Sequence, residues 1–210
     1  MKIKICGLTE EKEAAYVKKQ KVDFAGMVLF FQKSRRNISI EQAKKLIAVL
    51  SDEIQTVAVV VQPDFEQVAQ IEQAGFDYIQ IHGELSEDLL QQIHIPVLKA
   101  FNINDMQHYE AFQKYPQIAG YVFDAQEPGS GKAFDWNLMK TIQRDGRLFL
   151  LAGGLHADNV RAAIDAVHPD GVDVSSGVEF DSGSGKDPQK IRQFVQEVRK
   201  YDDGLDFRTV

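Results

Sequence analysis

Two reactive side chains stand where apolar stretches of the chain end. Cys6 ends the stretch 3–6 and precedes Gly7, and Asp124 follows the stretch 120–123. A thiol in such a place can act as a nucleophile or as a general base, although free cysteine is also among the most buried residue types. Partial burial raises the pKa of a carboxyl group and lets it act as an acid, whereas the structural alternative for Asp124 is a cap on the next turn. Cys6 and Asp124 are the candidate catalytic residues.

Small residues that could surround an anion follow two later apolar stretches. They are Gly153 and Gly154 after one stretch, and Ser175, Ser176 and Gly177 after the next. Small side chains let backbone N–H groups approach and ring a phosphate. A glycine pair alone is weak evidence, because turns use glycine freely. Two such loops together predict a phosphate site.

Further polar groups lie near the ends of neighbouring stretches. Arg36, with Arg35 beside it, could clamp a substrate carboxylate or could belong to a solvated basic loop. Gln80 and His82 alternate with apolar residues, so both are expected on one inward face, in a structural or a functional role. Lys99 could form a Schiff base with a carbonyl substrate.

The elements that must position these groups alternate regularly along the chain. Apolar stretches rich in Val, Ile and Phe predict buried strands at 3–6, 24–30, 56–61, 78–81, 97–100, 120–123, 148–151 and 171–174. Amphipathic stretches predict helices at 10–20, 41–50, 64–74, 86–93, 105–114, 134–144, 157–167 and 187–200. Thr9 and Ser39 are expected as N-caps and Gly75 as a C-cap.

Strand followed by helix, repeated eight times, predicts an α/β fold of the single-domain (β/α)₈ barrel class. An open doubly wound sheet usually has fewer units. The barrel is expected over residues 1–200, followed by a polar C-terminal tail at 201–210. In such barrels the catalytic groups lie at the carboxyl ends of the strands, and the loops after strands seven and eight commonly bind phosphate. The candidate residues all occupy such positions.

Composition excludes several classes of function. The 210 residues carry a formal net charge of -7, which gives no general attraction to nucleic acid or to an anionic membrane surface. One cysteine allows no internal disulfide and suits a reducing cytoplasm, and neither a signal peptide nor an apolar run of membrane-spanning length is seen. Glycine motifs for dinucleotides or nucleotides and Cys/His clusters at metal spacing are also missing, so no cofactor and no metal are predicted.

The sequence resembles the phosphoribosylanthranilate isomerase family over essentially its whole length. The segments that carry the resemblance are 4–9, 34–36, 80–83, Asp124 with 129–136, 152–155 with 159–160, and 171–179 followed by 185–187. The order of these motifs, each at the end of the appropriate strand, makes the resemblance specific. The chain departs from the family at Gln32 and Arg35, where prolines are common, and at Gln62, where asparagine is common.

The resemblance implies an activity and a role for each candidate residue. The reaction is the Amadori rearrangement of N-(5-phosphoribosyl)anthranilate to 1-(2-carboxyphenylamino)-1-deoxyribulose 5-phosphate, a step of tryptophan biosynthesis that needs no cofactor. By position, Cys6 matches the family's general base, Asp124 its general acid and Arg36 the arginine that meets the anthranilate carboxylate. The phosphate loops match the two small-residue loops, and Gln80 and His82 are expected in the pocket.

Other functions remain as alternatives at this stage. A different phosphate-binding barrel enzyme is one, namely a sugar-phosphate epimerase, an aldolase or a histidine-pathway aminoaldose isomerase. That isomerase typically uses two aspartates, and Cys6 argues against it. A non-catalytic phosphoribosyl-binding protein is another, and the presence of both Cys6 and Asp124 argues against it. The expected partner is a small phosphorylated molecule, and the expected assembly is a monomer or a homodimer.

Overall fold

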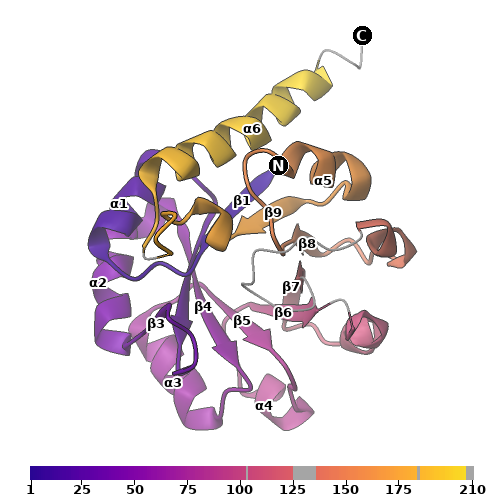
Figure 1. Ribbon diagram of the computed structural model, residues 1–210. Helices are drawn as coiled ribbons and strands as arrows, with labels where there is room; N and C mark the ends of the chain where they lie inside the picture. Colours follow the sequence, from indigo (N-terminus) through magenta and orange to yellow (C-terminus); the bar gives the residue numbers. More distant parts are fainter. Residues whose placement is uncertain (103, 125–135, 184, 207–210) are drawn as a thin grey trace.

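A closed parallel barrel forms the centre of the protein (Figure 1). The computed structural model describes residues 1–102, 104–124, 136–183 and 185–206. The strands of the barrel are β1 (Lys2–Cys6), β2 (Phe24–Leu29), β4 (Gln55–Val61), β5 (Tyr78–His82), β6 (Val97–Asn102), β7 (Ile118–Asp124), β8 (Leu148–Leu151) and β9 (Gly171–Val174). Each strand pairs in parallel with the next, and the pairing of β1 with both β9 and β2 closes the barrel. All the predicted strands are confirmed, and the short strand β3 (Asn37–Ile38) adds to the edge of β2.

Helices surround the barrel on its outside (Figure 1). They are α1 (Glu11–Lys19), α2 (Ile40–Leu50), α3 (Phe65–Ala74), α4 (Glu87–Gln91), α5 (Val160–Val167) and α6 (Pro188–Asp206), with 3₁₀ segments η1 (Ser51–Glu53), η2 (Met106–Phe112), η3 (Trp136–Thr141) and η4 (Ser176–Val178). Helix α6 continues to Asp206, past residue 200, where the polar tail was expected to begin. None of the helices among the described residues is long and apolar enough to cross a membrane.

Two of the three predicted helix caps are confirmed. The Ser39 hydroxyl accepts the N–H of Gln42 at the start of α2, and Gly75 takes a left-handed conformation, with φ of 84°, at the end of α3. The prediction of Thr9 as the N-cap of α1 is wrong, because Glu10 takes that position. The reason is Glu13, whose carboxylate accepts the backbone N–H groups of Thr9 and Glu10 and the Thr9 hydroxyl.

Two of the predicted helices are short 3₁₀ segments instead. These are η2, expected at 105–114, and η3, expected at 134–144. In a 3₁₀ segment residues three apart lie one above the other. Tyr109 and Phe112 of η2 are so related, and both pack edge-on against Phe101 of β6. Packing of these rings, rather than the amphipathic pattern, fixes the local conformation.

Alternation along the strands separates the barrel interior from the layer under the helices. The inward-facing cluster is mostly apolar and contains Cys6, Phe24, Val57, Val59, Leu98, Ala100, Val122, Leu150 and Ala152. Larger aliphatic and aromatic side chains fill the layer between strands and helices. Because all strands are parallel, their carboxyl ends meet at one mouth of the barrel. The residues that end the strands therefore face a common space.

Candidate active site

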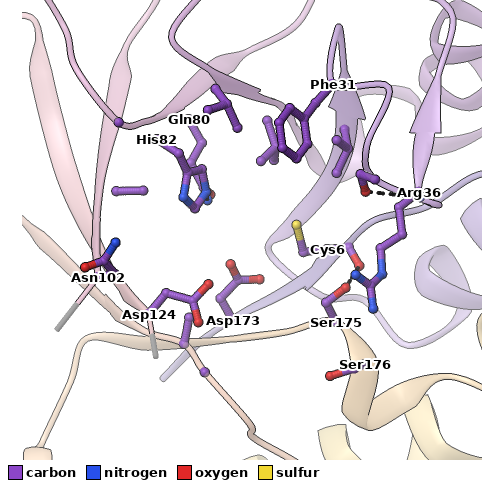
Figure 2. Close-up of a pocket in the computed structure, with 18 of the residues that line it drawn as sticks. Cys6, Phe31, Arg36, Gln80, His82, Asn102, Asp124, Asp173, Ser175 and Ser176 are labelled. Carbon is purple, nitrogen blue, oxygen red and sulfur yellow. Dashed lines mark hydrogen bonds between the residues drawn. The ribbon is translucent and has the colours of Figure 1, made fainter. Parts of the chain in front are cut away.

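A cavity of about 470 Å³ lies at the carboxyl ends of the barrel strands. All the predicted site residues except Gly177 line it, namely Cys6, Arg36, Gln80, His82, Asp124, Gly153, Gly154, Ser175 and Ser176. Gly177 lines an adjoining cavity of about 380 Å³, which shares Gly154, Leu155 and Ser176 with the first. Figure 2 shows Cys6 and Asp124 in the pocket wall with Asp173 between them. The pocket thus brings together groups that are far apart in the sequence.

Cys6 ends β1 and presents a buried thiol to the pocket. Its register partner on β2 is Gly26, and a Cβ atom on that glycine would lie 2.8 Å from the Cys6 sulfur. Burial raises the pKa of the thiol, and the positive charges of Lys4 and Lys186 act in the opposite direction. A base at this position therefore depends on nearby cations to reach its thiolate form.

Asp124 ends β7 and is only partly buried. Its register partner is Asn102, which ends β6 and also lines the pocket. Figure 2 shows its carboxylate directed into the same space as Asp173. Residues 129–135 of the segment that follows Asp124 in the resemblance lie outside the described part of the chain.

The two adjacent arginines have different surroundings. Arg36 lines the pocket with 14% of its side chain exposed, whereas Arg35 is 56% exposed and is not among the lining residues. Both donate to the buried carboxylate of Glu179, Arg36 through Nε at 2.6 Å and through Nη2 at 3.1 Å. This two-point contact fixes the orientation of the Arg36 guanidinium. Of the two, Arg36 has the position expected of a substrate clamp.

Glu179 also connects Arg36 to the loop after β9. The ammonium of Lys186, 1% exposed, donates to Glu179 at 3.1 Å and to the carbonyl and hydroxyl oxygens of Ser175 at 3.1 and 3.2 Å. The Ser175 hydroxyl in turn donates to the carbonyl of Cys6 at 2.9 Å. One buried network therefore supports the arginine, the small-residue loop and the strand that carries the thiol.

The two small-residue loops lie against each other and present unused donors. A Cβ atom on Gly177 would lie only 2.0 Å from the carbonyl oxygen of Leu155, so this close approach requires glycine. The amide of Asn159 donates to the carbonyl of Gly154 at 2.9 Å and holds the loop after β8 in place. Within the described part of the chain, no acceptor is found for the N–H groups of Gly153, Gly154, Ser176 and Gly177. Such an array suits an anion.

Gln80 and His82 form the wall across the pocket from Arg36 (Figure 2). The Gln80 amide donates to Nε2 of His82 at 2.8 Å. Burial, with smaller contributions from Lys99 and Lys4, lowers the pKa of His82 to about 3. His82 is therefore a neutral imidazole over the physiological range, which suits a polar wall rather than a proton carrier.

Lys99 does not belong to this pocket. Its ammonium donates to the carbonyl of Ala100 at 2.7 Å and lies 4.6 Å from the centre of the Phe101 ring, on the outer side of the barrel. The alternating residues Leu98 and Ala100 face inward instead. A Schiff base between Lys99 and a substrate in the pocket is thus excluded, and with it the aldolase alternative for this lysine.

Four charged residues at the site were assigned no role from the sequence. Lys4 and Asp173 form an ion pair inside the barrel, with Nζ and Oδ2 2.7 Å apart, and Glu179 and Lys186 form the network described above. The sequence contained an indication for Lys4: it lies two residues before Cys6 on β1, so the two side chains share the inward face of that strand. Similarly, Asp173 of β9 lies two residues before Ser175, which begins the loop after that strand.

Comparisons with known proteins show that the chain is similar over nearly its whole length to proteins of one family. The sequence profile of the family described as N-(5'phosphoribosyl)anthranilate (PRA) isomerase matches residues 3–197. The N-(5'-phosphoribosyl)anthranilate isomerase of Streptococcus gordonii is 40% identical over 200 residues, which are 94% of this chain and 97% of that protein.

Solved structures of the same kind superpose along nearly the whole chain. The phosphoribosyl anthranilate isomerase of Thermus thermophilus gives a TM-score of 0.84 at 29% identity, covering 95% of this chain and 99% of that one. A phosphoribosyl anthranilate isomerase in complex with reduced 1-(o-carboxyphenylamino)-1-deoxyribulose 5-phosphate gives 0.81 at 32% identity, with the same coverage.

Proposed function

Because this chain belongs to the N-(5'-phosphoribosyl)anthranilate isomerase family, we propose that Cys6 and Asp124 are the base and the acid of the reaction it catalyses. That reaction is the isomerisation of N-(5'-phosphoribosyl)anthranilate in tryptophan biosynthesis. The observation that carries the proposal is the presence of Cys6, Asp124 and Arg36 in the wall of one cavity that also contains the small-residue loops. The substrate is a small phosphorylated molecule.

The proton transfers follow from the positions of these groups. Asp124 donates a proton to the furanose ring oxygen, and the anilino nitrogen drives ring opening to the protonated imine. The thiolate of Cys6 then removes the proton from C2, which the imine has acidified, and gives the enolamine. This enol becomes the ketone as C1 gains a proton and the C2 hydroxyl loses one, so that protons gained and lost over the whole reaction are equal. Each transfer by a positioned group contributes about 10² to 10⁴ in rate.

Two sets of binding groups in the cavity wall would hold C2 against the thiol. We assign the anthranilate carboxylate to Arg36, whose guanidinium is oriented by Glu179. The phosphate is assigned to the loops that contain Gly153, Gly154, Ser175, Ser176 and Gly177. Of these residues, all except Ser175 have a backbone N–H without an acceptor among the described residues. Binding energy from these remote groups positions the reacting carbon.

The remaining assignments are proposals of the same kind. Gln80 and His82 form a neutral polar wall of the pocket. The cytoplasm is the proposed location, supported by the single unpaired cysteine. Assembly as a monomer or as a homodimer stays a prediction.

An activity assay on a single variant tests the acid–base assignment. Consumption of freshly made phosphoribosylanthranilate is followed by its fluorescence for the native chain and for Cys6→Ser. The variant should keep its thermal unfolding curve and its substrate affinity and lose most of kcat, because a serine hydroxyl is a far weaker base. Near-normal turnover by Cys6→Ser would remove Cys6 from the mechanism.

A further inference from the structure

A buried ion pair lies beside Cys6 inside the barrel. Lys4 of β1 and Asp173 of β9 are register partners, and the ammonium meets Oδ2 at 2.7 Å. The Lys4 side chain is fully buried and Asp173 is 7% exposed. Removing two charges from water costs free energy that burial of an apolar pair of similar volume would not cost. A buried ion pair is therefore poor evidence of a purely stabilising role. The surrounding inward-facing side chains are largely apolar.

The ammonium and the thiol occupy one niche. Lys4 and Cys6 are two residues apart on β1 and point to the same face. Opposite them stands Gly26, and a Cβ atom there would lie 2.8 Å from the Cys6 sulfur and 3.2 Å from Nζ of Lys4. The absence of a side chain at Gly26 thus makes room for both groups, and the ammonium and the sulfur border the same small space.

Asp173 anchors the ammonium with only one of its oxygens. Oδ2 accepts from Lys4, whereas Oδ1 is buried and has no hydrogen-bond partner among the described residues. Figure 2 shows the carboxylate directed into the pocket between Cys6 and Asp124. Asp173 therefore lines the pocket, whereas Lys4 is fully buried and is not among the lining residues.

We propose that Lys4 is a positioning residue whose ammonium, anchored by Asp173, stabilises the thiolate form of Cys6. This inference rests on the proposed role of Cys6 as the general base. Lys4 would not touch substrate and would act only through the thiol.

The charges around the thiol support this role. Burial raises the pKa of Cys6, the Lys4 charge lowers it, and the Asp173 carboxylate raises it again. For Lys4, burial alone would lower the pKa, but Asp173 and Cys6 more than offset burial, so its pKa is raised and it stays charged. The ionisable groups that line the pocket with Cys6 or act on its charge are Lys4, Arg36, His82, Asp105, Asp124, Asp173 and Lys186.

The chain offers a direct test, because Cys6 is its single cysteine. The rate of alkylation by iodoacetamide, measured against pH, reports the thiolate of Cys6 alone. Lys4→Met should move the midpoint of this profile to higher pH and slow alkylation at neutral pH by about tenfold or more. In Asp173→Asn the amide oxygen can still accept from Lys4, and the Cys6 thiolate becomes the counter-charge of the ammonium. Because this variant removes a negative charge that raises the pKa of Cys6, it should move the midpoint to lower pH and speed alkylation. Lys99→Met, which removes another buried lysine but from the outer side of the barrel, is the matched control.

Opposite shifts of the alkylation midpoint in Lys4→Met and Asp173→Asn, with Lys99→Met unchanged, support the proposal. The effect of a packing defect would not depend on the sign of the charge that is removed. A Lys4→Met midpoint equal to that of the control, or lower than it, overturns the proposal. If Lys4→Met does not fold, Lys4→Gln, which keeps a donor toward Asp173, takes its place: a midpoint at higher pH supports the role of the ammonium, and an unchanged or lower midpoint refutes it. The alkylation profile does not depend on turnover, so a fully active Cys6→Ser variant would defeat the proposed base without altering this result.

Discussion

Glu179→Gln is the substitution for which the structure gives the largest expected effect outside the acid–base pair. The Glu179 carboxylate is 5% exposed and accepts from Arg35, Arg36 and Lys186. Glutamine has the same shape but is neutral, and its NH₂ group would face donors. Lys186, 1% exposed, would then remain buried without a counter-charge.

The magnitude follows from the burial of this network. Removing one partner of a buried ionic cluster costs about 3–5 kcal/mol, and because the glutamine oxygen can still accept, we expect about 3 kcal/mol. For a domain of this size that corresponds to a fall in Tm of about 6–12 °C. Looser orientation of Arg36 should raise KM by about tenfold, equivalent to about 1.4 kcal/mol, with a smaller change in kcat.

The stability difference should also depend on pH. Burial alone would raise the pKa of Glu179, but hydrogen bonds and charges from Arg36 and Lys186 more than offset burial, so the pKa lies below its usual 4.5. The stabilisation by the carboxylate is therefore complete above pH 4.5 and is lost as the pH falls through the lower, folded-state pKa. The Tm values of the native chain and of Glu179→Gln should converge on acidification.

Thermal unfolding by circular dichroism and steady-state kinetics measure these effects. The matched control is Glu197→Gln, which removes a more exposed carboxylate that pairs with Lys200 and Arg161 on the surface. Such surface pairs contribute about 0–1 kcal/mol. Equal Tm values for the two variants, together with an unchanged KM for Glu179→Gln, would refute the role given to the network.

Three further predictions concern the pocket itself. Asp124→Asn should bind substrate with a similar KM and lose kcat by about 10² or more, whereas unfolding with full activity per folded molecule would identify Asp124 as a structural cap. Gly177→Ala places a Cβ atom 2.0 Å from the carbonyl of Leu155, so it should lower Tm and weaken inhibition by inorganic phosphate, and an unchanged inhibition constant would move the phosphate site elsewhere. His82→Gln should leave the pH profile of activity unaltered, because burial, Lys99 and Lys4 hold the pKa of His82 at about 3. As the pH falls from 6.5 to about 3, the native chain should also lose more stability than His82→Gln, because His82 binds a proton in the unfolded chain but not in the folded one. Identical acid unfolding curves for the two proteins would contradict this.

Much of the site was accessible from the sequence because of how a parallel barrel is built. Strands buried on both faces appear as continuous apolar stretches, so their ends can be located without knowing their neighbours. Once the strands are counted, all their carboxyl ends must meet at one mouth. Cys6, Asp124 and the loops that contain Gly153 and Ser175 could therefore be placed together from chain order alone.

The sequence could not decide which alternate residues of a strand face inward. A strand that is apolar on both faces gives no such signal, and for this reason Lys99 was a candidate although its ammonium packs against Phe101 outside the barrel. The same limit applied to η2, where contacts of Tyr109 with rings on other elements replaced the expected α-helix.

Chain order thus determined the barrel, its mouth and the reactive residues that stand there. Only the tertiary structure determined how those residues are supported. The pair of Lys4 with Asp173 joins positions 169 residues apart, and the contact of Arg36 with Glu179 joins positions 143 apart. Such contacts depend on the lateral register of strands and on the loops that cross between them, which local propensity does not encode. Buried charges need partners, and the closed barrel brings those partners within 3 Å of each other.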